Sequence, residues 1–171
     1  MANAYKITSD PFFINGNTTE TAVDTYTQLS ISAPLDSLNQ EGLLIHAVYF
    51  SGDEPASVPG AESSVFYQLT STNKLARVGV NDANLISGQQ KIITGGAAEF
   101  SGPHVIDLIT SNDAYQVSDN LMVVATDDLF LAIQGFGQVA PRSVQVRIVC
   151  SRIKLTASAY AALVTNEFFR W

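Results

Sequence analysis

The stretch 143-SVQVRIVCSRIKL-155 decides the fold. From position 144 to position 151 its residues alternate, with Val144, Val146, Ile148 and Cys150 on one side and Gln145, Arg147, Val149 and Ser151 on the other. A period of two is typical of a β-strand that buries one face. The pattern therefore predicts a strand over Ser143–Leu155 with a buried, apolar side and an opposite side that is free for other contacts.

Similar short runs precede this stretch along the chain. They cover residues 23–31, 43–50, 64–70, 75–80, 90–94, 104–110, 121–126 and 129–134. The run Leu43–Phe50 is apolar on both sides apart from His46, which predicts a central strand covered on both faces. Asp127 and Asp128 separate the last two runs and favour a tight hairpin or a bulge there. Pro55, Pro59 and Gly60 predict a loop over residues 52–63.

The two ends of the chain have other patterns. Residues 1–20 are polar and interrupted by Pro11 and Gly16, and we interpret them as an N-terminal arm. After Thr156, a plausible N-cap, apolar residues recur at helical spacing from Ala157 to Phe168, which predicts a short C-terminal helix. The expected organisation is an arm over 1–20, a β-sandwich domain over 21–155 and a helical segment over 156–171.

About eight strands without repeated alternation of strand and helix indicate an all-β fold. The expected architecture is a two-sheet antiparallel β-sandwich, not a doubly wound α/β domain. A chain of 171 residues is long enough to bury one sizeable core without a metal or a disulfide. The longest apolar runs are far shorter than the ~20 residues that cross a bilayer, and residues 1–13 lack the apolar core of a signal peptide.

The composition is poor in charge. Charged residues make up 15% of the chain, against about 25% in an average soluble domain. Ser, Thr, Asn and Gln together supply 48 residues, so neutral hydrogen-bonding groups replace the missing charges. Because charge is depleted in the cores of protein interfaces, this surface suits close contact with neighbouring molecules. An ordinary monomer with an uncharged polar surface is the alternative.

The charge is also unevenly distributed along the chain. Residues 1–141 hold 15 acidic and four basic side chains, whereas residues 142–171 hold five basic side chains and one acidic. We name Arg147, Arg152, Lys154 and Arg170 as candidate assembly contacts, since a basic end of one copy could meet the acidic body of the next. Five spaced bases are too few to favour nucleic-acid binding.

Motifs for catalysis are missing from the sequence. There is no G-x-S-x-G elbow, and Cys150 falls on the apolar side of its strand, where a thiol usually packs as a small hydrophobic group. His46 and His104 have no paired motif or acid at ligand spacing. We therefore expect no enzyme activity, no catalytic residue, no cofactor and no metal site.

Two weaker signals also have ordinary explanations. The acid pairs Asp53-Glu54 and Asp127-Asp128 could bind calcium in loops, but the spaced acids of a dedicated site are absent and such pairs commonly form turns. The motif Gly135-Phe136-Gly137 lacks the third glycine and the lysine of a phosphate loop and fits a corner between strands.

Taken together, the polar arm, the strand pattern, the Pro-Gly loop at 52–63 and the aromatic-ended C-terminal segment resemble one protein family. The pattern over residues 21–155 is similar to the single jelly-roll coat (capsid) proteins of icosahedral viruses. The resemblance implies a jelly-roll fold and a structural role without catalysis, in which many copies of the chain form a closed, homo-oligomeric shell.

The same resemblance carries expectations about partners and location. It implies a virion protein assembled in the host cytoplasm, and it allows a second coat protein in the lattice and peripheral contact with an internal membrane or a genome. Residues 1–20 hold only Lys6 as a base, so the arm itself is not expected to bind the genome.

A second class of function stays open at this point. The chain could be a carbohydrate- or protein-binding β-sandwich module, such as a viral fibre tip or a lectin-like domain. That function would use the loop at 52–63, with Tyr67 or Tyr115 as a stacking platform.

Overall fold

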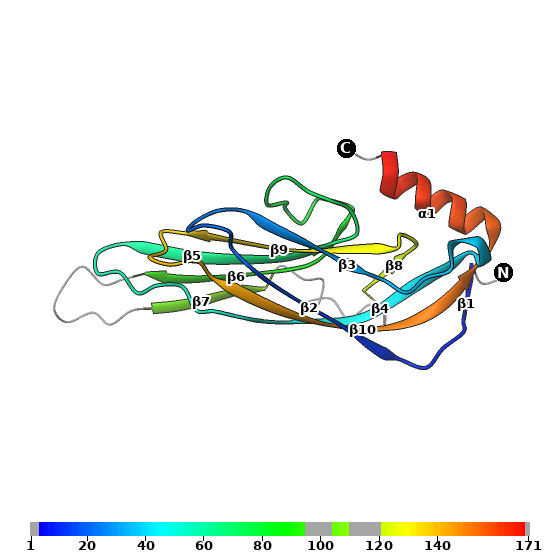
Figure 1. Cartoon of the computed structure of the whole chain (residues 1–171), viewed down its shortest axis with the longest axis horizontal. Helices are drawn as coiled ribbons and strands as arrows, with labels where there is room; N and C mark the ends of the chain where they lie inside the picture. Colours follow the sequence, from blue (N-terminus) through cyan, green and yellow to red (C-terminus); the bar gives the residue numbers. More distant parts are fainter. Residues whose placement is uncertain (1–3, 95–103, 110–120, 170–171) are drawn as a thin grey trace.

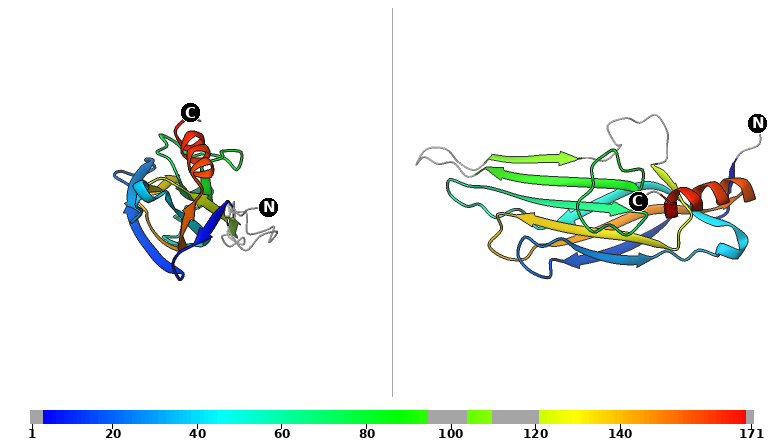
Figure 2. Two further views of the ribbon diagram at one scale, coloured as in Figure 1. Left: turned by 90° about the vertical axis from the view of Figure 1, so that its right-hand side faces the viewer. Right: turned by 90° about the horizontal axis from the view of Figure 1, so that it is seen from above.

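The backbone forms two antiparallel sheets that pack face to face (Figures 1 and 2). A computed structural model describes residues 4–94, 104–109 and 121–169. The strands are β1 (Tyr5–Ile7), β2 (Phe12–Thr19), β3 (Thr27–Ser32), β4 (Glu41–Gly52), β5 (Glu62–Thr70), β6 (Leu85–Thr94), β7 (His104–Ile109), β8 (Met122–Val124), β9 (Asp128–Phe136) and β10 (Ser143–Leu155). A 3-10 turn, η1 (Ser37–Asn39), precedes β4, and the helix α1 (Ala157–Phe169) follows β10.

Within the described residues, each sheet contains five strands. In sheet A, β10 pairs with β4 on one edge and with β1 and β2 on the other, and β8 pairs with the far edge of β4. In sheet B the order is β3-β9-β5-β6-β7. The expected two-sheet antiparallel sandwich is confirmed.

The strand pairs identify the topology as a jelly roll. β2 pairs with β10, β3 with β9, β4 with β8 and β5 with β6. These nested pairs are those of one long antiparallel hairpin. Rolling that hairpin up brings β10 beside β4 and β9 beside β5, which divides it into the two four-stranded layers of a jelly roll. β1 and β7 extend the two sheets beyond those eight strands.

The core lies between the two sheets and follows the alternation seen in the sequence. The predicted buried side of β10 is buried at 0–3% exposure, and it faces apolar side chains of sheet B. The residues that face it from β5 and β9 are Val65, Tyr67, Leu69, Leu129, Leu131 and Ile133. Because both inner faces are apolar at every second position, the sheets bury them against each other.

The central strand β4 is covered on both faces, as its sequence predicts. Leu43 and Ile45 belong to the core between the sheets, whereas Leu44 belongs to a second cluster with Ile153 and Leu155. The register of β4 against β10 shifts at His46, which is the extra residue of a β-bulge.

Helix α1 covers this second cluster. Ala159, Tyr160, Leu163 and Val164 pack against the outer face of sheet A near the end of β10 (Figure 1). Thr156 caps the helix, because its Oγ1 accepts a hydrogen bond from the backbone N–H of Ala159 at 3.3 Å. The predicted C-terminal helix and its cap are therefore both present.

The segment expected to be an arm instead supplies two strands of sheet A. Phe12, Ile14, Gly16 and Thr18 alternate inward along β2, where every second residue is partly buried. Gly16 allows close packing at this point, since a Cβ atom there would lie 2.2 Å from Cδ1 of Ile31. The sequence concealed this period of two, because the inner positions 16 and 18 hold Gly and Thr, and the outer position 13 holds Phe.

Three local expectations were wrong. The strand expected from residue 23 starts only at Thr27, because Asp24 has a φ of 57° and belongs to a turn. Residues 75–80 are not a strand but part of the connection between β5 and β6. Asp127 and Asp128 form no hairpin, since β8 and β9 lie in different sheets and the chain crosses between them there.

One prediction concerns Gly52 at the end of β4. A Cβ atom at this position would lie 2.4 Å from Cζ of Tyr67, whose ring is fully buried and whose hydroxyl donates to the Asp53 carbonyl. We expect Gly52→Ala to lower the free energy of unfolding by about 1–3 kcal/mol through overpacking. Gly79→Ala is the matched control, because nothing lies within 4 Å of its Cβ position. Urea denaturation measures both, and equal stabilities would contradict the packing described for Tyr67.

A second prediction concerns Cys150, the only cysteine. Its side chain is buried, and burial raises the pKa of the thiol to about 11 although the charge of Arg152 opposes this shift. Since the thiolate is the reactive form, we expect the native protein to resist Ellman's reagent at pH 8 and to react after unfolding in guanidinium chloride. A Leu75→Cys variant, with an exposed position, should show one fast-reacting thiol. Fast reaction of the unmodified chain would contradict the burial of Cys150.

Candidate interaction surfaces

The residues with catalytic or ligand-binding potential do not gather into one site. Cys150 is fully buried in the core, and Nε2 of His46 lies 2.9 Å from Oγ of Ser151. The side chain of His104 lies outside the part of the chain that the structure describes. Within the described residues, no three His, Cys, Asp or Glu side chains come together in a way that could hold a metal ion.

Several acidic side chains serve instead as acceptors for backbone N–H groups at one end of the sandwich. Glu20, which is 4% exposed, accepts from Gly135 at 2.6 Å and from Arg142 at 2.9 Å. Asp24 accepts from Gly137 and Gln138, each at 3.0 Å. These four bonds hold the end of β9 and the β9–β10 turn, here defined as residues 136–142, because a turn has few backbone partners of its own.

Gln138 completes this framework from inside the turn. Its Oε1 accepts from the backbone N–H of Ala56 at 2.9 Å and from Nε of Arg142 at 2.8 Å, and its Nε2 donates to the carbonyl of Ser64 at 3.0 Å. The turn is thereby tied to the 53–61 loop and to β5. Its two large hydrophobic side chains, Phe136 and Val139, remain 66% and 73% exposed.

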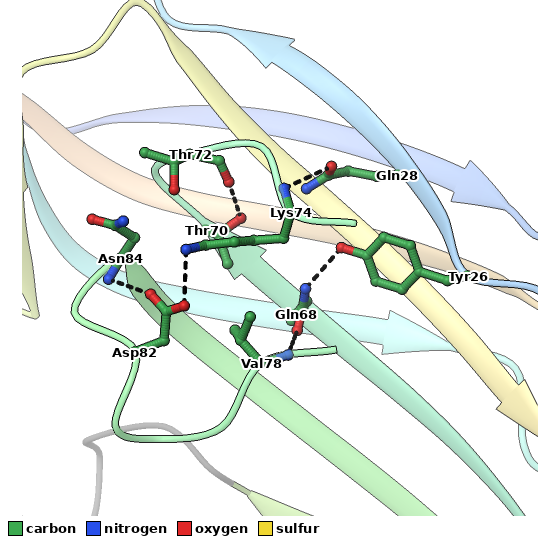
Figure 3. Close-up of polar contacts among 9 residues, drawn as sticks. All are labelled: Tyr26, Gln28, Gln68, Thr70, Thr72, Lys74, Val78, Asp82 and Asn84. Carbon is green, nitrogen blue, oxygen red and sulfur yellow. Dashed lines mark hydrogen bonds and ion pairs between the residues drawn. The ribbon is translucent and has the colours of Figure 1, made fainter. Parts of the chain in front are cut away.

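A second loop is held in a similar way. The connection between β5 and β6, residues 71–84 and here named the strap, lies over the outer face of sheet B (Figures 1 and 3). Glutamines on three strands of that face accept from it: Gln28 from the Lys74 N–H at 3.2 Å, Gln68 from the Val78 N–H at 3.0 Å, and Gln90 from the Arg77 guanidinium at 2.8 Å.

Further contacts close the strap on itself. Lys74 forms an ion pair with Asp82 at 2.8 Å. Partial burial would raise the pKa of Asp82, but the hydrogen bonds from Lys74 and from the Asn84 N–H, with the Lys74 charge, lower it overall. The Gln68 amide donates to the hydroxyl of Tyr26, whose pKa burial raises, so this hydroxyl stays protonated at neutral pH (Figure 3).

The strap covers a buried aromatic ring and leaves two aliphatic side chains in solvent. The guanidinium of Arg77 lies 4.2 Å from the ring centre of Phe66, which is only 4% exposed. Leu75 and Val80 are 93% and 68% exposed. The strap and the β9–β10 turn are therefore anchored loops that present apolar side chains.

The basic residues named from the sequence are not brought together. β10 alternates without a bulge of its own, so Arg147 projects from the outer face of sheet A and Arg152 from the other face. Each lies over one of two neighbouring rings of β2, Arg147 over Phe13 and Arg152 over Phe12. Lys154 is exposed and lies between Lys6 of β1 and Glu41 of β4. Arg170 lies outside the described residues.

A groove of about 770 Å³ lies on the outer face of sheet A, at the opposite end from α1. Its lining residues come from β2, β4 and β10, and Arg147 is the only one among them with a full charge. Phe13 and Tyr49 are 62% and 61% exposed in it. Alternation along β10 predicted the outward direction of Arg147, but the sequence could not show which residues of β2 and β4 lie beside it.

Of the two stacking platforms proposed for the 52–63 loop, Tyr67 is not available. Tyr67 is fully buried, and its hydroxyl donates to the Asp53 carbonyl at 2.5 Å. This correction follows from the position of Tyr67 on the inner face of β5, between Val65 and Leu69. Tyr115 lies outside the described residues.

A third prediction concerns Glu20, whose carboxylate supports the β9–β10 turn through two hydrogen bonds. Glu20→Ala leaves two N–H groups without their acceptor in a buried setting, so we expect a loss of about 1–3 kcal/mol in the free energy of unfolding. Asp10→Ala removes an exposed carboxylate as a control and should change stability little. Thermal denaturation measures both, and a Glu20→Ala variant as stable as the Asp10 control would refute this role.

Comparison with known proteins gives matches among solved structures. No protein-family model and no curated protein matches the chain. Among solved structures, a chain from Desmodium yellow mottle tymovirus matches with 16% sequence identity and a TM-score of 0.30, over 92% of this chain and 94% of that one. The helix that the structure describes is not long and apolar enough to span a membrane. The fold assignment rests on the sheet topology: this chain is an antiparallel jelly-roll sandwich.

Proposed function

We propose that this protein is a structural, self-assembling subunit, a viral coat (capsid) protein whose copies form an icosahedral shell in the virion. The observation that carries the proposal is the pair of anchored loops. The strap and the β9–β10 turn are held by side-chain hydrogen bonds, yet Leu75, Val80, Phe136 and Val139 stand in solvent.

An anchored loop with apolar tips suits a protein interface for two reasons. Fully burying a Val, Leu or Phe side chain at an interface stabilises the association by roughly 1.5–3 kcal/mol. A side chain that stays in water contributes none of this free energy. A loop that is already ordered also loses less conformational entropy when it binds. Two such loops on one small domain therefore favour association over an isolated monomer.

A second copy of the chain is the partner that the surface chemistry favours. Only two ion pairs are found within the described residues, and several carboxylates are engaged by backbone N–H groups. What remains on the surface is mostly neutral and polar, and such groups can be desolvated against a like surface at lower cost than ions can. No catalytic step is part of this proposal.

The proposal also includes partners other than copies of this chain. It includes peripheral contact of the assembled shell with an internal membrane or a genome. A second coat protein in the lattice would share the surfaces presented by the two anchored loops.

The test is removal of the exposed apolar tips. We expect the double variant Leu75→Ser, Val80→Ser, and separately Phe136→Ser, Val139→Ser, to stay folded but to need at least about tenfold more protein to assemble, because each loses more than about 1.4 kcal/mol of burial. Sedimentation velocity over a range of concentrations, with electron microscopy of the particles, measures this.

The control variant is Leu38→Ser, which removes an equally exposed leucine (93%) from η1, outside both loops. It should assemble like the unmodified chain. A monomeric mass for the unmodified chain at all concentrations, or normal assembly of both double variants, would overturn the proposal.

A further inference from the structure

The side chains that line the groove on the outer face of sheet A form a grid. The rows of this grid follow from the strand register. Arg147 on β10 lies opposite Asn15 on β2 and Tyr49 on β4, which makes one row across three strands. In the next row Gln145 lies opposite Asn17 and Ser51. In the row on the other side, Val149 lies opposite Phe13 and Ala47. Rows of this kind are about 7 Å apart and neighbouring strands about 4.8 Å.

Arg147 at the centre of this grid is held in place. Its Nε donates to Oδ1 of Asn15 at 3.4 Å, and its guanidinium carbon lies 5.5 Å from the ring centre of Phe13. Its two terminal nitrogens take part in no ion pair within the described residues. A guanidinium fork fixed on one side by an amide and an aromatic ring is ready to receive a carboxylate on the other.

The rest of the lining consists of aromatic rings and neutral hydrogen-bonding groups. Phe13 and Tyr49 are exposed on the two strands beside β10 and lie in neighbouring rows, about 12 Å apart by the strand and row spacings, with Arg147 on the strand between them. Amides and a hydroxyl surround them, namely those of Asn15, Asn17, Gln145 and Ser51. Aromatic faces that pack on a ring and amides that pair with hydroxyl groups are the chemistry that recognises a sugar.

Other classes of ligand fit this lining less well. An acidic peptide or a nucleic acid presents several anionic groups, and the groove offers one cation. An apolar partner surface would have to desolvate four neutral polar side chains and an arginine without pairing them. A saccharide with one carboxylate uses every group that the groove presents.

We propose that this groove is a binding site for an acidic saccharide, in which Arg147 pairs with the carboxylate of a pyranose ring that packs on Tyr49 or Phe13. The neutral side chains bind the hydroxyl groups of the sugar. The inference rests on the groove alone and does not depend on whether copies of the chain assemble. It gives a jelly-roll subunit a means of attachment to an acidic glycan surface.

The experiment uses the full chain and ligand-observed NMR with four sugar probes. Glucuronate and N-acetylneuraminate carry a carboxylate, and glucose and N-acetylglucosamine serve as neutral partners. We expect saturable, weak binding of at least one acidic sugar and at least about tenfold weaker binding of the neutral ones, since a hydrogen-bonded charge pair is lost. A polymer of glucuronate shows whether extended glycan binds more tightly than the free sugar, and poly-glutamate tests the peptide class.

Variants at the surface separate the site from general charge effects. Arg147→Ala should weaken binding of the acidic sugar at least about tenfold, and Tyr49→Ala should weaken both kinds of sugar. Lys154→Ala is the matched control, because it removes an exposed base from the opposite face of the same strand, and its affinity should be unchanged. Equal binding of neutral and acidic sugars, equal or tighter binding of poly-glutamate, no binding of any sugar, or an Arg147→Ala variant with full affinity would overturn the proposal.

Discussion

Strand β10 must satisfy backbone hydrogen bonds along both of its edges, and the rest of the sandwich depends on this constraint. It is the only strand in the described residues that pairs with three others: β4 along one edge, and β2 and then β1 along the other. Its inner side chains fill the core at the same positions. Because an unpaired buried backbone group costs as much as a lost hydrogen bond, the N-terminal segment cannot leave this edge without exposing the core.

The acidic residues have a different role from the one that their number suggests. A net charge of −7 with a basic C-terminal segment implied an acidic body. In the structure, Glu20, Asp24, Asp36 and Asp53 each accept backbone N–H groups at turns. They stabilise the loop geometry one by one at these turns. The two anchored loops owe part of their rigidity to this use of carboxylates.

The sequence predicted the elements that local pattern determines. It did not predict those that depend on contacts between distant residues. The bounds of β10, the double burial of β4 and the helix after Thr156 follow from local periodicity, and all were predicted. Residues 75–80 are apolar enough for a strand, but Gln28 and Gln68 accept from the backbone N–H groups of Lys74 and Val78. Gln90 accepts from the Arg77 side chain, and these contacts together hold the segment in the strap. Asn15 and Tyr49 meet at Arg147 only through strand register, which no local pattern in this chain reveals.

The bulge at His46 has a consequence for how this chain can change its length. On the N-terminal side of the bulge, odd-numbered residues of β4 face the core, as Leu43 and Ile45 do; beyond it, even-numbered residues do, as Val48 and Phe50 show. Deleting one residue within the strand would therefore turn the inward side chains of one half outward unless it removed the bulge itself. A single-residue deletion at His46 or Ala47 would therefore preserve the apolar face of β4 by straightening the strand. The 53–61 loop next to β4 can lose or gain residues without reversing any side chain of the strand.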